Sequence, residues 1–329
     1  MGYYRTVLSL NEMQPGNMVD QVRASVLVSD AYESLRSVDL AAASGLLERA
    51  LAEDFDDPEV LYALKCAEFW SDRAARSESV RGPFERGEYI VSQWKSFVSF
   101  SSRLGGDFER ARYAFKRYAF SLALAHYRAV PQEEREPHEA ELALRIGRCL
   151  KGSGDFDAAL GQLEAAAKER REDAEVLAEL ADVYALVNEG RAAKALFREA
   201  FFIAPQRIDL ELLESELVAR LVERVRAEGK SGPELAEWVP VYGTLLGVFN
   251  VKRELKAVEA GKLRNSIYQL ENELKENAED RHLLVPRLVN RYFWLVDHCI
   301  AAREDRARIE ELLLKIRLLD PAIHKQYTA

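Results

Sequence analysis

The sequence predicts an all-α protein made of stacked helical hairpins, and three observations lead to this prediction. A pattern of small, large and proline residues repeats every 34 positions between residues 140 and 207. Proline and glycine are scarce, at 10 and 17 of the 329 residues. Ala, Leu, Glu and Arg are abundant, and the strict apolar–polar alternation of half-buried strands is absent.

The repeat is clearest in two consecutive units. Its matching positions are Gly147 and Ala181, Leu150 and Tyr184, Ala159 and Ala193, and Ala166 and Ala200. Small residues let two helix backbones approach closely, and the large Leu163 and Phe197 fill the grooves beside them. Asp155 is expected to cap the second helix of its hairpin, and Pro205 to end the second unit.

This pattern resembles the tetratricopeptide-repeat (TPR) family. The resemblance implies a right-handed superhelical solenoid of two-helix hairpins, with extra helices at the C-terminal end. It also implies a concave face that is lined by first helices and binds peptides or partner proteins. The match is strong at 140–207, good at 92–125 and 24–57, and degenerate elsewhere.

The repeat register divides the chain into three parts. Residues 1–23 are a lead-in, residues 24–207 the repeat array, and residues 208–329 a helical C-terminal region. The expected repeat units lie near 24–57, 58–91, 92–125, 140–173 and 174–207, with a degenerate repeat near 290–323. Helices in the C-terminal region are expected at about 208–229, 233–249, 251–277 and 279–303.

Local signals support individual helix boundaries. Asp39 is expected to cap the second helix of the first unit, and Pro58 to open the next unit, because proline is favoured in the first helical turn. Gly243 and Gly247 lie four residues apart in an apolar stretch, which indicates close helix packing.

Charge and composition narrow the class of protein. The net charge of −9 argues against nucleic acid as a partner, because nucleic-acid binding requires a basic surface. No apolar run is long enough to span a membrane, and the apolar residues 6–10 are too few for a secretion signal. We therefore expect a cytoplasmic protein, with the alternative of a natural leader preceding the sequence left open.

No catalytic or metal-binding pattern stands out. Asp297, His298 and Cys299 are adjacent, but successive helical residues point about 100° apart, so they do not face one another. The five histidines show no metal-ligand spacing, and no glycine-rich phosphate loop occurs. We expect a protein that is not an enzyme and has no cofactor or metal.

The resemblance also indicates which first-helix positions face the groove. These candidate partner-binding residues are Tyr32, Arg36, Tyr62, Phe69, Phe100, Arg103, Arg145, Arg148 and Lys151. Three of the cations, Arg145, Arg148 and Lys151, are spaced by three residues and share one side of a helix. Arginine binds carboxylates and aromatic side chains anchor partners, so the expected ligand is an acidic segment with an apolar anchor.

The sequence thus predicts a scaffold or adaptor that binds a segment of another protein. Two alternatives stay open. The first is a structural protein that self-assembles into homo-oligomers. The second is a small-molecule carrier or enzyme with a pocket between the repeats and the C-terminal helices.

Overall fold

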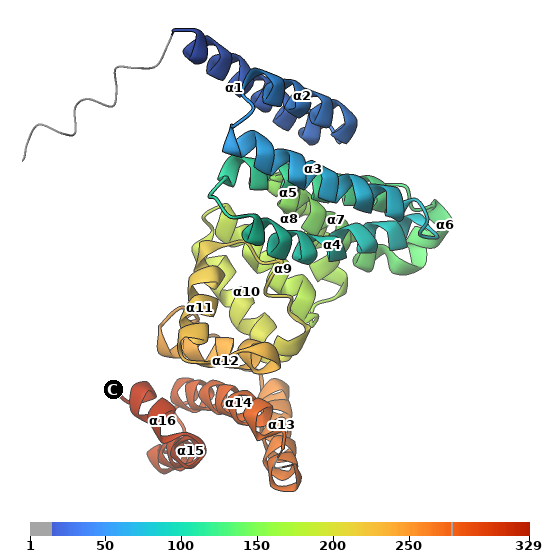
Figure 1. The fold of residues 1–329 in the computed structure, drawn as a ribbon. Helices are drawn as coiled ribbons and strands as arrows, with labels where there is room; N and C mark the ends of the chain where they lie inside the picture. Colours follow the sequence, from blue (N-terminus) through green and yellow to red (C-terminus); the bar gives the residue numbers. More distant parts are fainter. Residues whose placement is uncertain (1–14, 278) are drawn as a thin grey trace, which may run out of the picture. The chain divides into compact units, whose positions relative to one another are not determined.

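The computed structural model describes residues 15–277 and 279–329, with side chains described from residue 22 onward. Within these ranges the chain is all-helical, and no strand occurs (Figure 1). The chain forms two compact units, one up to Ala159 and one from Leu160, which we describe separately. Of the predicted lead-in 1–23, residues 1–14 lie outside the described residues, and the rest belongs to the first helix.

Unit 1 contains six longer helices and two short helical turns in the described part of the chain. They are α1 (Pro15–Arg36), α2 (Leu40–Glu53), α3 (Pro58–Ser77), α4 (Pro83–Leu104), α5 (Glu109–Arg128), α6 (Gln132–Arg135), η1 (Glu136–His138) and α7 (Glu139–Ser153). Helix α8 (Phe156–Glu169) crosses the boundary between the two units.

Several predicted helix boundaries are confirmed. The Asp39 carboxylate accepts a hydrogen bond from the backbone N–H of Ala42 at 2.9 Å, which caps α2. Helix α3 begins at Pro58, as predicted. Gly154 ends α7 in the left-handed conformation, at φ 87°, and the Asp155 carboxylate accepts from Ala158 N–H at 3.3 Å at the start of α8.

Neighbouring helices of unit 1 pack in pairs, with one departure from the predicted register. Helix α1 packs on both α2 and α5, and α4 packs on α5. The predicted unit 58–91 contains α3, but its last residues belong to α4, which pairs with α5 instead. Helix α3 lies between α2 and α4 and packs on both, and it also contacts α5.

An aromatic cluster forms the core of unit 1. Trp70 from α3 packs against Phe97 from α4, with ring centroids 5.4 Å apart, and against Tyr118 from α5 at 6.1 Å. These three side chains are at most 2% exposed. Burial of such large rings contributes strongly to stability, so this cluster fixes α3 against α4 and α5.

Unit 2 continues the helical pattern to the end of the chain. Its helices are α9 (Ala174–Leu186), α10 (Gly190–Ile203), η2 (Pro205–Arg207), α11 (Glu216–Ala227), α12 (Gly232–Leu245), α13 (Ala257–Glu276), α14 (Arg281–Ala301), α15 (Arg306–Leu319) and α16 (Pro321–Tyr327). Helix α10 ends at Ile203, two residues before Pro205, which confirms the helix end predicted from this proline. None of the helices in the described residues is both long and apolar enough to cross a lipid bilayer.

Two of the helices predicted in unit 2 begin later than the sequence indicates. The helix expected from 208 begins at Glu216, because the Asp182 carboxylate accepts hydrogen bonds from the N–H groups of Glu214 and Ser215, both at 2.8 Å. The helix expected from 251 begins at Ala257. Residues 250–256 are not helical, and the Val251 carbonyl accepts from Arg198 at 3.2 Å.

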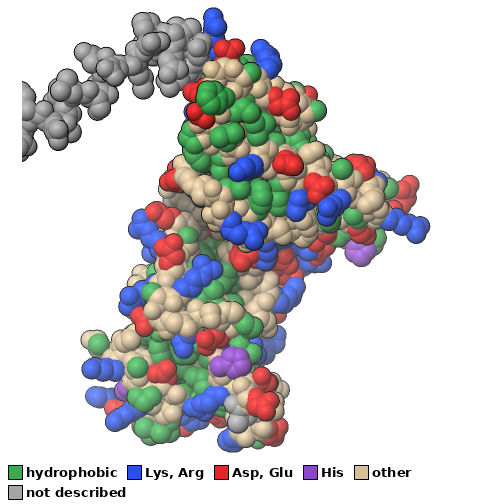
Figure 2. Space-filling view, in the orientation of Figure 1, with side chains coloured by type: hydrophobic (Ala, Val, Ile, Leu, Met, Phe, Trp, Pro, Cys, Tyr) green, Lys and Arg blue, Asp and Glu red, His purple; other side chains and the backbone are tan. Residues whose placement is uncertain are grey.

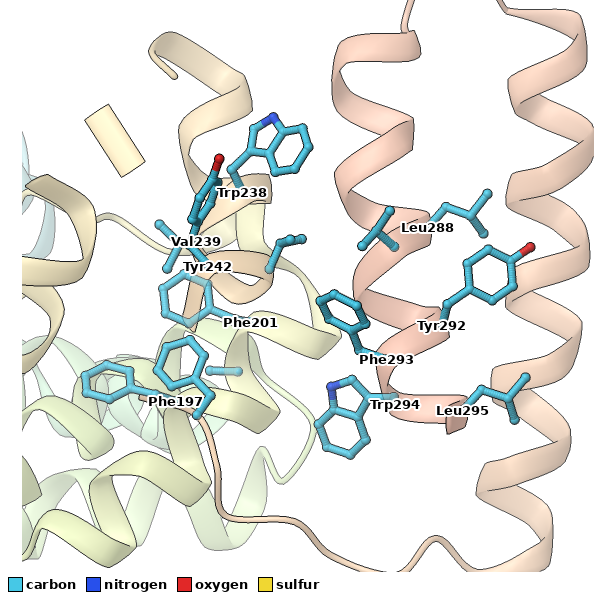
Figure 3. Close-up of a cluster of buried hydrophobic side chains, with 14 of the residues drawn as sticks. Phe197, Phe201, Trp238, Val239, Tyr242, Leu288, Tyr292, Phe293, Trp294 and Leu295 are labelled. Atoms are coloured by element: carbon cyan, nitrogen blue, oxygen red, sulfur yellow. The ribbon is translucent and has the colours of Figure 1, made fainter. Parts of the chain in front are cut away.

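The core of unit 2 gathers aromatic side chains from α10, α12 and α14 (Figure 3). Phe197 and Phe201 of α10 are fully buried and stack with Phe249, which follows α12. Gly243 makes room for this ring, because a Cβ atom there would lie 2.3 Å from the Phe249 side chain. Gly243 is therefore closely packed, but against a ring of the following segment and not against another helix. Gly247 lies beyond the end of α12, at φ 69°, and a Cβ atom there would meet nothing within 4 Å, so the predicted close helix packing of this glycine pair is wrong.

We predict that Ala193→Leu destabilises unit 2. Ala193 is fully buried where α10 packs on α9, so added methyl groups would overfill the interface. Overpacking of this kind costs about 1–3 kcal/mol. The measurement is the urea midpoint of the full chain, and Ala195→Leu, at a partly exposed position of the same helix, is the matched control. An unchanged midpoint for Ala193→Leu would contradict the packing.

Candidate partner-binding groove

A groove of about 1100 Å³ lies on unit 1, between α2, α3 and α4. Helix α2 provides Ser44 and Glu48, and α4 provides Ser96, Phe100 and Arg103. The residues of α3 in the lining are Leu61, Leu64, Lys65, Ala67, Glu68, Phe69, Ser71, Asp72, Arg73 and Ala75. A concave site of this size is large enough for several side chains of a bound segment.

Helix α3 forms the floor of the groove. Leu61, Lys65, Glu68 and Asp72 follow one another at helical spacing and are all exposed. In the space-filling view, hydrophobic surface at the level of α2 and α3 is interrupted by single acidic and basic side chains (Figure 2). The floor is thus partly apolar and carries both signs of charge.

A stacked aromatic pair joins the floor to one wall. The rings of Phe69 and Phe100 lie 4.9 Å apart at an interplanar angle of 29°. The Arg73 guanidinium lies 3.6 Å from the centroid of the Phe69 ring and donates to the Phe69 carbonyl at 3.3 Å. Phe69 is buried, whereas Phe100 is partly exposed, so Phe100 presents the aromatic surface of the groove.

The charged lining of the groove is balanced in sign. The lining contains three acidic and three basic side chains, which are Glu48, Glu68 and Asp72, and Lys65, Arg73 and Arg103. Asp72 is bound by Arg73 at 3.4 Å and by Arg76 at 2.8 Å. Lys65 and Arg103 are exposed and form no ion pair with any other described residue. These two cations are therefore the groove's available partners for a carboxylate.

The structure brings together only some of the predicted groove residues. Phe69, Phe100 and Arg103 line this groove, and the α1 and early α3 residues do not. Tyr32 donates to Glu59 at 2.8 Å, and burial together with this hydrogen bond raises the pKa of its hydroxyl. Arg36 and Tyr62 also lie outside the groove lining.

Those two residues lie outside the groove for different reasons. Arg36 is exposed at the end of α1, 3.5 Å from Glu33, and has no aromatic residue paired with it in the described structure. Tyr62 is 4% exposed and packs against Phe108, with ring centroids 4.9 Å apart. Its ring therefore belongs to the core of unit 1.

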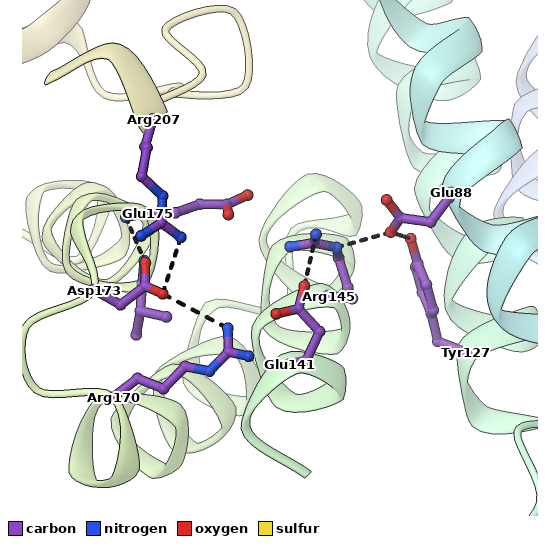
Figure 4. Close-up of polar contacts among 9 residues, drawn as sticks. Glu88, Tyr127, Glu141, Arg145, Arg170, Asp173, Glu175 and Arg207 are labelled. Carbon is purple, nitrogen blue, oxygen red and sulfur yellow. Dashed lines mark hydrogen bonds and ion pairs between the residues drawn. The ribbon is translucent and has the colours of Figure 1, made fainter. Parts of the chain in front are cut away.

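The three predicted cations of α7 do not extend the groove. Arg145 binds Glu88 at 2.8 Å and Glu141 at 2.7 Å, and Tyr127 donates to the same Glu88 carboxylate (Figure 4). Arg145 lines a second cavity of unit 1, of about 640 Å³, whose other charged groups include Glu85 and Glu133. Its surroundings are therefore acidic rather than cationic.

Arg148 and Lys151 differ most from the expectation. The sequence placed both on an exposed concave face, whereas they are 5% and 1% exposed. A buried charge is stabilised only by partners inside the protein, so these side chains do not present free positive charge at the surface. The cationic stretch expected from Arg103 through Lys151 is not formed.

Sequence reasoning missed one wall of the groove. Ser44 and Glu48 belong to α2, a second helix of its hairpin, which the family geometry assigns to the opposite face. The signal that could have found them is the spacing of four residues between two polar side chains, which places both on one face of the helix.

The three cysteines of the chain lie in the protein interior. Cys66, Cys149 and Cys299 are all buried. Burial raises the pKa of the Cys66 thiol to about 12, and burial with a hydrogen bond to Glu304 raises the pKa of Cys299 to about 11. Both thiols are protonated near neutral pH, when the thiolate is the reactive form. In the described residues no group of three or more His, Cys, Asp or Glu side chains is arranged to hold a metal ion.

No protein-family model matches this chain, and no curated protein is similar to it in sequence. The fold and the groove define an all-helical protein of packed neighbouring helices with a partly apolar cleft on its first unit. The similarity to tetratricopeptide repeats remains a prediction from the residue pattern.

Proposed function

We propose that this protein is a non-enzymatic scaffold or adaptor of the tetratricopeptide-repeat type. It binds a segment of another protein in the groove formed by α2, α3 and α4. The observation that carries the proposal is the groove itself, with the partly exposed Phe100 stacked on Phe69 beside exposed cations. Partner segments commonly lay apolar anchors into such helix-lined grooves.

The chemistry of the groove narrows the partner. Phe100 and the exposed Leu61 provide an apolar surface for one large side chain. Arg103 lies one helical turn beyond Phe100, so a carboxylate near that anchor can bind its guanidinium in a bidentate manner. Glu48 and Glu68 add negative charge to the lining, which favours a segment of mixed charge over a purely acidic one.

The binding test uses peptides displayed on phage, selected against the full chain. We expect enrichment of sequences with an aromatic or large aliphatic residue followed closely by an acidic residue. Arg103→Glu should weaken the affinity for the selected peptides by about fivefold or more, which corresponds to a loss of roughly 1 kcal/mol of binding free energy. Stability should change by about 1 kcal/mol or less, because Arg103 is exposed and without a described ion-pair partner.

A matched control separates groove binding from a general charge effect. Arg81→Glu makes the same charge change at an exposed position in the turn between α3 and α4, outside the groove lining. It should leave peptide affinity unchanged. Equal weakening by Arg103→Glu and Arg81→Glu, or selection of no common sequence, would show that the groove is not the binding site.

A second candidate function is self-assembly, which one feature of unit 2 favours. Leu314 and Leu318 lie one turn apart on α15 and are 52% and 74% exposed. Exposed apolar pairs of this kind mark association surfaces when they belong to a larger patch. Light scattering tests this function: mass that rises with concentration, and falls to the monomer value in Leu314→Glu/Leu318→Glu, would support it over the groove.

A further inference from the structure

A separate small cavity lies within unit 2 and carries two arginines. Its volume is about 190 Å³, and it is formed where the end of α10 and η2 meet α13 and α14. The polar residues of its lining are Gln206, Ser266, Gln269, Glu273, Arg287 and Arg291. The groove proposal does not involve any of these residues.

Arg291 is the residue of this cavity whose charge is least satisfied. Its Nε is buried and has no hydrogen-bond partner among the described residues, and the guanidinium forms no ion pair there. Its Nη1 donates to the Phe202 carbonyl at 3.4 Å, and the guanidinium lies 5.3 Å from the centroid of the Phe202 ring. A buried donor without an acceptor is costly, and more so when it carries a charge.

Arg287, the other arginine, already has a counter-ion. Its Nε donates to the Glu237 carboxylate at 3.3 Å, and Glu237 is 1% exposed. This ion pair raises the pKa of Arg287, whereas burial and the neighbouring Arg287 lower the pKa of Arg291. The cavity therefore contains one neutralised guanidinium and one that lacks an anion.

We propose that this cavity binds a small oxyanion, a phosphate or a carboxylate group, on the guanidinium of Arg291. An oxyanion in the cavity supplies the negative charge that the Arg291 guanidinium lacks among the described residues. The side-chain amides of Gln206 and Gln269 line the same space and can donate further hydrogen bonds. Glu273 is exposed in the lining and repels anions of high charge most strongly, so the site favours a singly charged oxyanion.

The test measures the binding of phosphate, acetate and chloride to the protein, each separately and at equal ionic strength. Isothermal titration and thermal unfolding of the full chain should show saturable binding and a rising melting temperature with phosphate or acetate, and neither with chloride. Arg291→Met should weaken that binding by about tenfold or more, because a charge-assisted hydrogen bond is lost. The proposal would be wrong if chloride raised the melting temperature equally, or if Arg291→Met bound the anions as tightly as the unmodified chain.

Two further variants exclude a purely structural explanation. Without added anion, Arg291→Met should leave the melting temperature unchanged or raise it, because the substitution removes an unpaired buried charge. A marked fall in the melting temperature would show that the side chain is structural, and would count against the anion site. Gln269→Leu, at an exposed position, should fold normally and bind the anion several-fold more weakly. The control Arg220→Met removes an exposed arginine of α11 and should bind like the unmodified chain.

Discussion

Asp297→Ala is expected to destabilise unit 2 by about 3–5 kcal/mol, because it removes one partner of a buried ion pair. Asp297 accepts hydrogen bonds from Arg198 and Lys252. Arg198 is 4% exposed and Asp297 8% exposed, and the Arg198 guanidinium lies 4.4 Å from the Trp294 ring. Without the carboxylate, Arg198 would remain buried without its counter-ion.

The comparison that tests this explanation replaces both partners. Arg198→Met/Asp297→Leu should be much closer in stability to the unmodified chain than Asp297→Ala, since no uncompensated charge stays buried. Glu310→Ala breaks an exposed pair on α15 and should change stability by about 0.5 kcal/mol or less. Urea unfolding followed by tryptophan fluorescence measures all three variants.

The same ion pair should control the segment before α13. Arg198 donates to the Val251 carbonyl, and Lys252 binds Asp297, so both contacts hold residues 250–256 against α10 and α14. Hydrogen exchange in this segment should accelerate in Asp297→Ala more than in Glu310→Ala. Equal exchange in the two variants would show that other contacts hold the segment.

Phe249→Ala is expected to cost about 3–5 kcal/mol, the range for removing a large buried ring. Phe249 is 1% exposed and stacks on Phe201, with ring centroids 5.6 Å apart, and on Phe197 at 6.4 Å. The cavity left behind would be bounded by rings of α10 and by α12, which cannot collapse onto it without moving helices.

A second substitution makes this prediction specific to the packing of one ring. Gly243→Ala should destabilise the unmodified chain by about 1–3 kcal/mol, because its Cβ would meet the Phe249 ring. In the Phe249→Ala background the same change should become neutral or stabilising, since alanine favours a helix over glycine by about 1 kcal/mol. A double-mutant cycle from urea midpoints measures the reversal, and simple additivity would contradict the contact.

Local parts of the fold could be predicted because their causes lie within a few residues. The 34-residue pattern located α9 and α10, and single residues such as Asp39, Pro58 and Pro205 predicted helix ends that the structure confirms. Caps, prolines and small residues act on the backbone next to them, so their effects survive in any tertiary arrangement.

The candidate groove could be predicted only in part. The resemblance to tetratricopeptide repeats implied Phe69, Phe100 and Arg103 as groove residues, and these three do line one groove. The contribution of α2, from Ser44 and Glu48, was not predicted, because only first helices were expected to line the groove. The sequence also could not predict which of the candidate side chains are exposed. Arg148 was expected at the surface, but it is buried because neighbouring elements pack around it.

The sequence by itself determined an all-helical chain and the ends of several helices. The tertiary structure alone decided which charges pair, as with Arg198 and Asp297, which are 99 residues apart. It also decided that residues 208–215 and 250–256 leave the helical pattern, through Asp182 in one case and Arg198 in the other. Helix periodicity is a local property, whereas an ion pair or a groove depends on distant segments that meet only after folding.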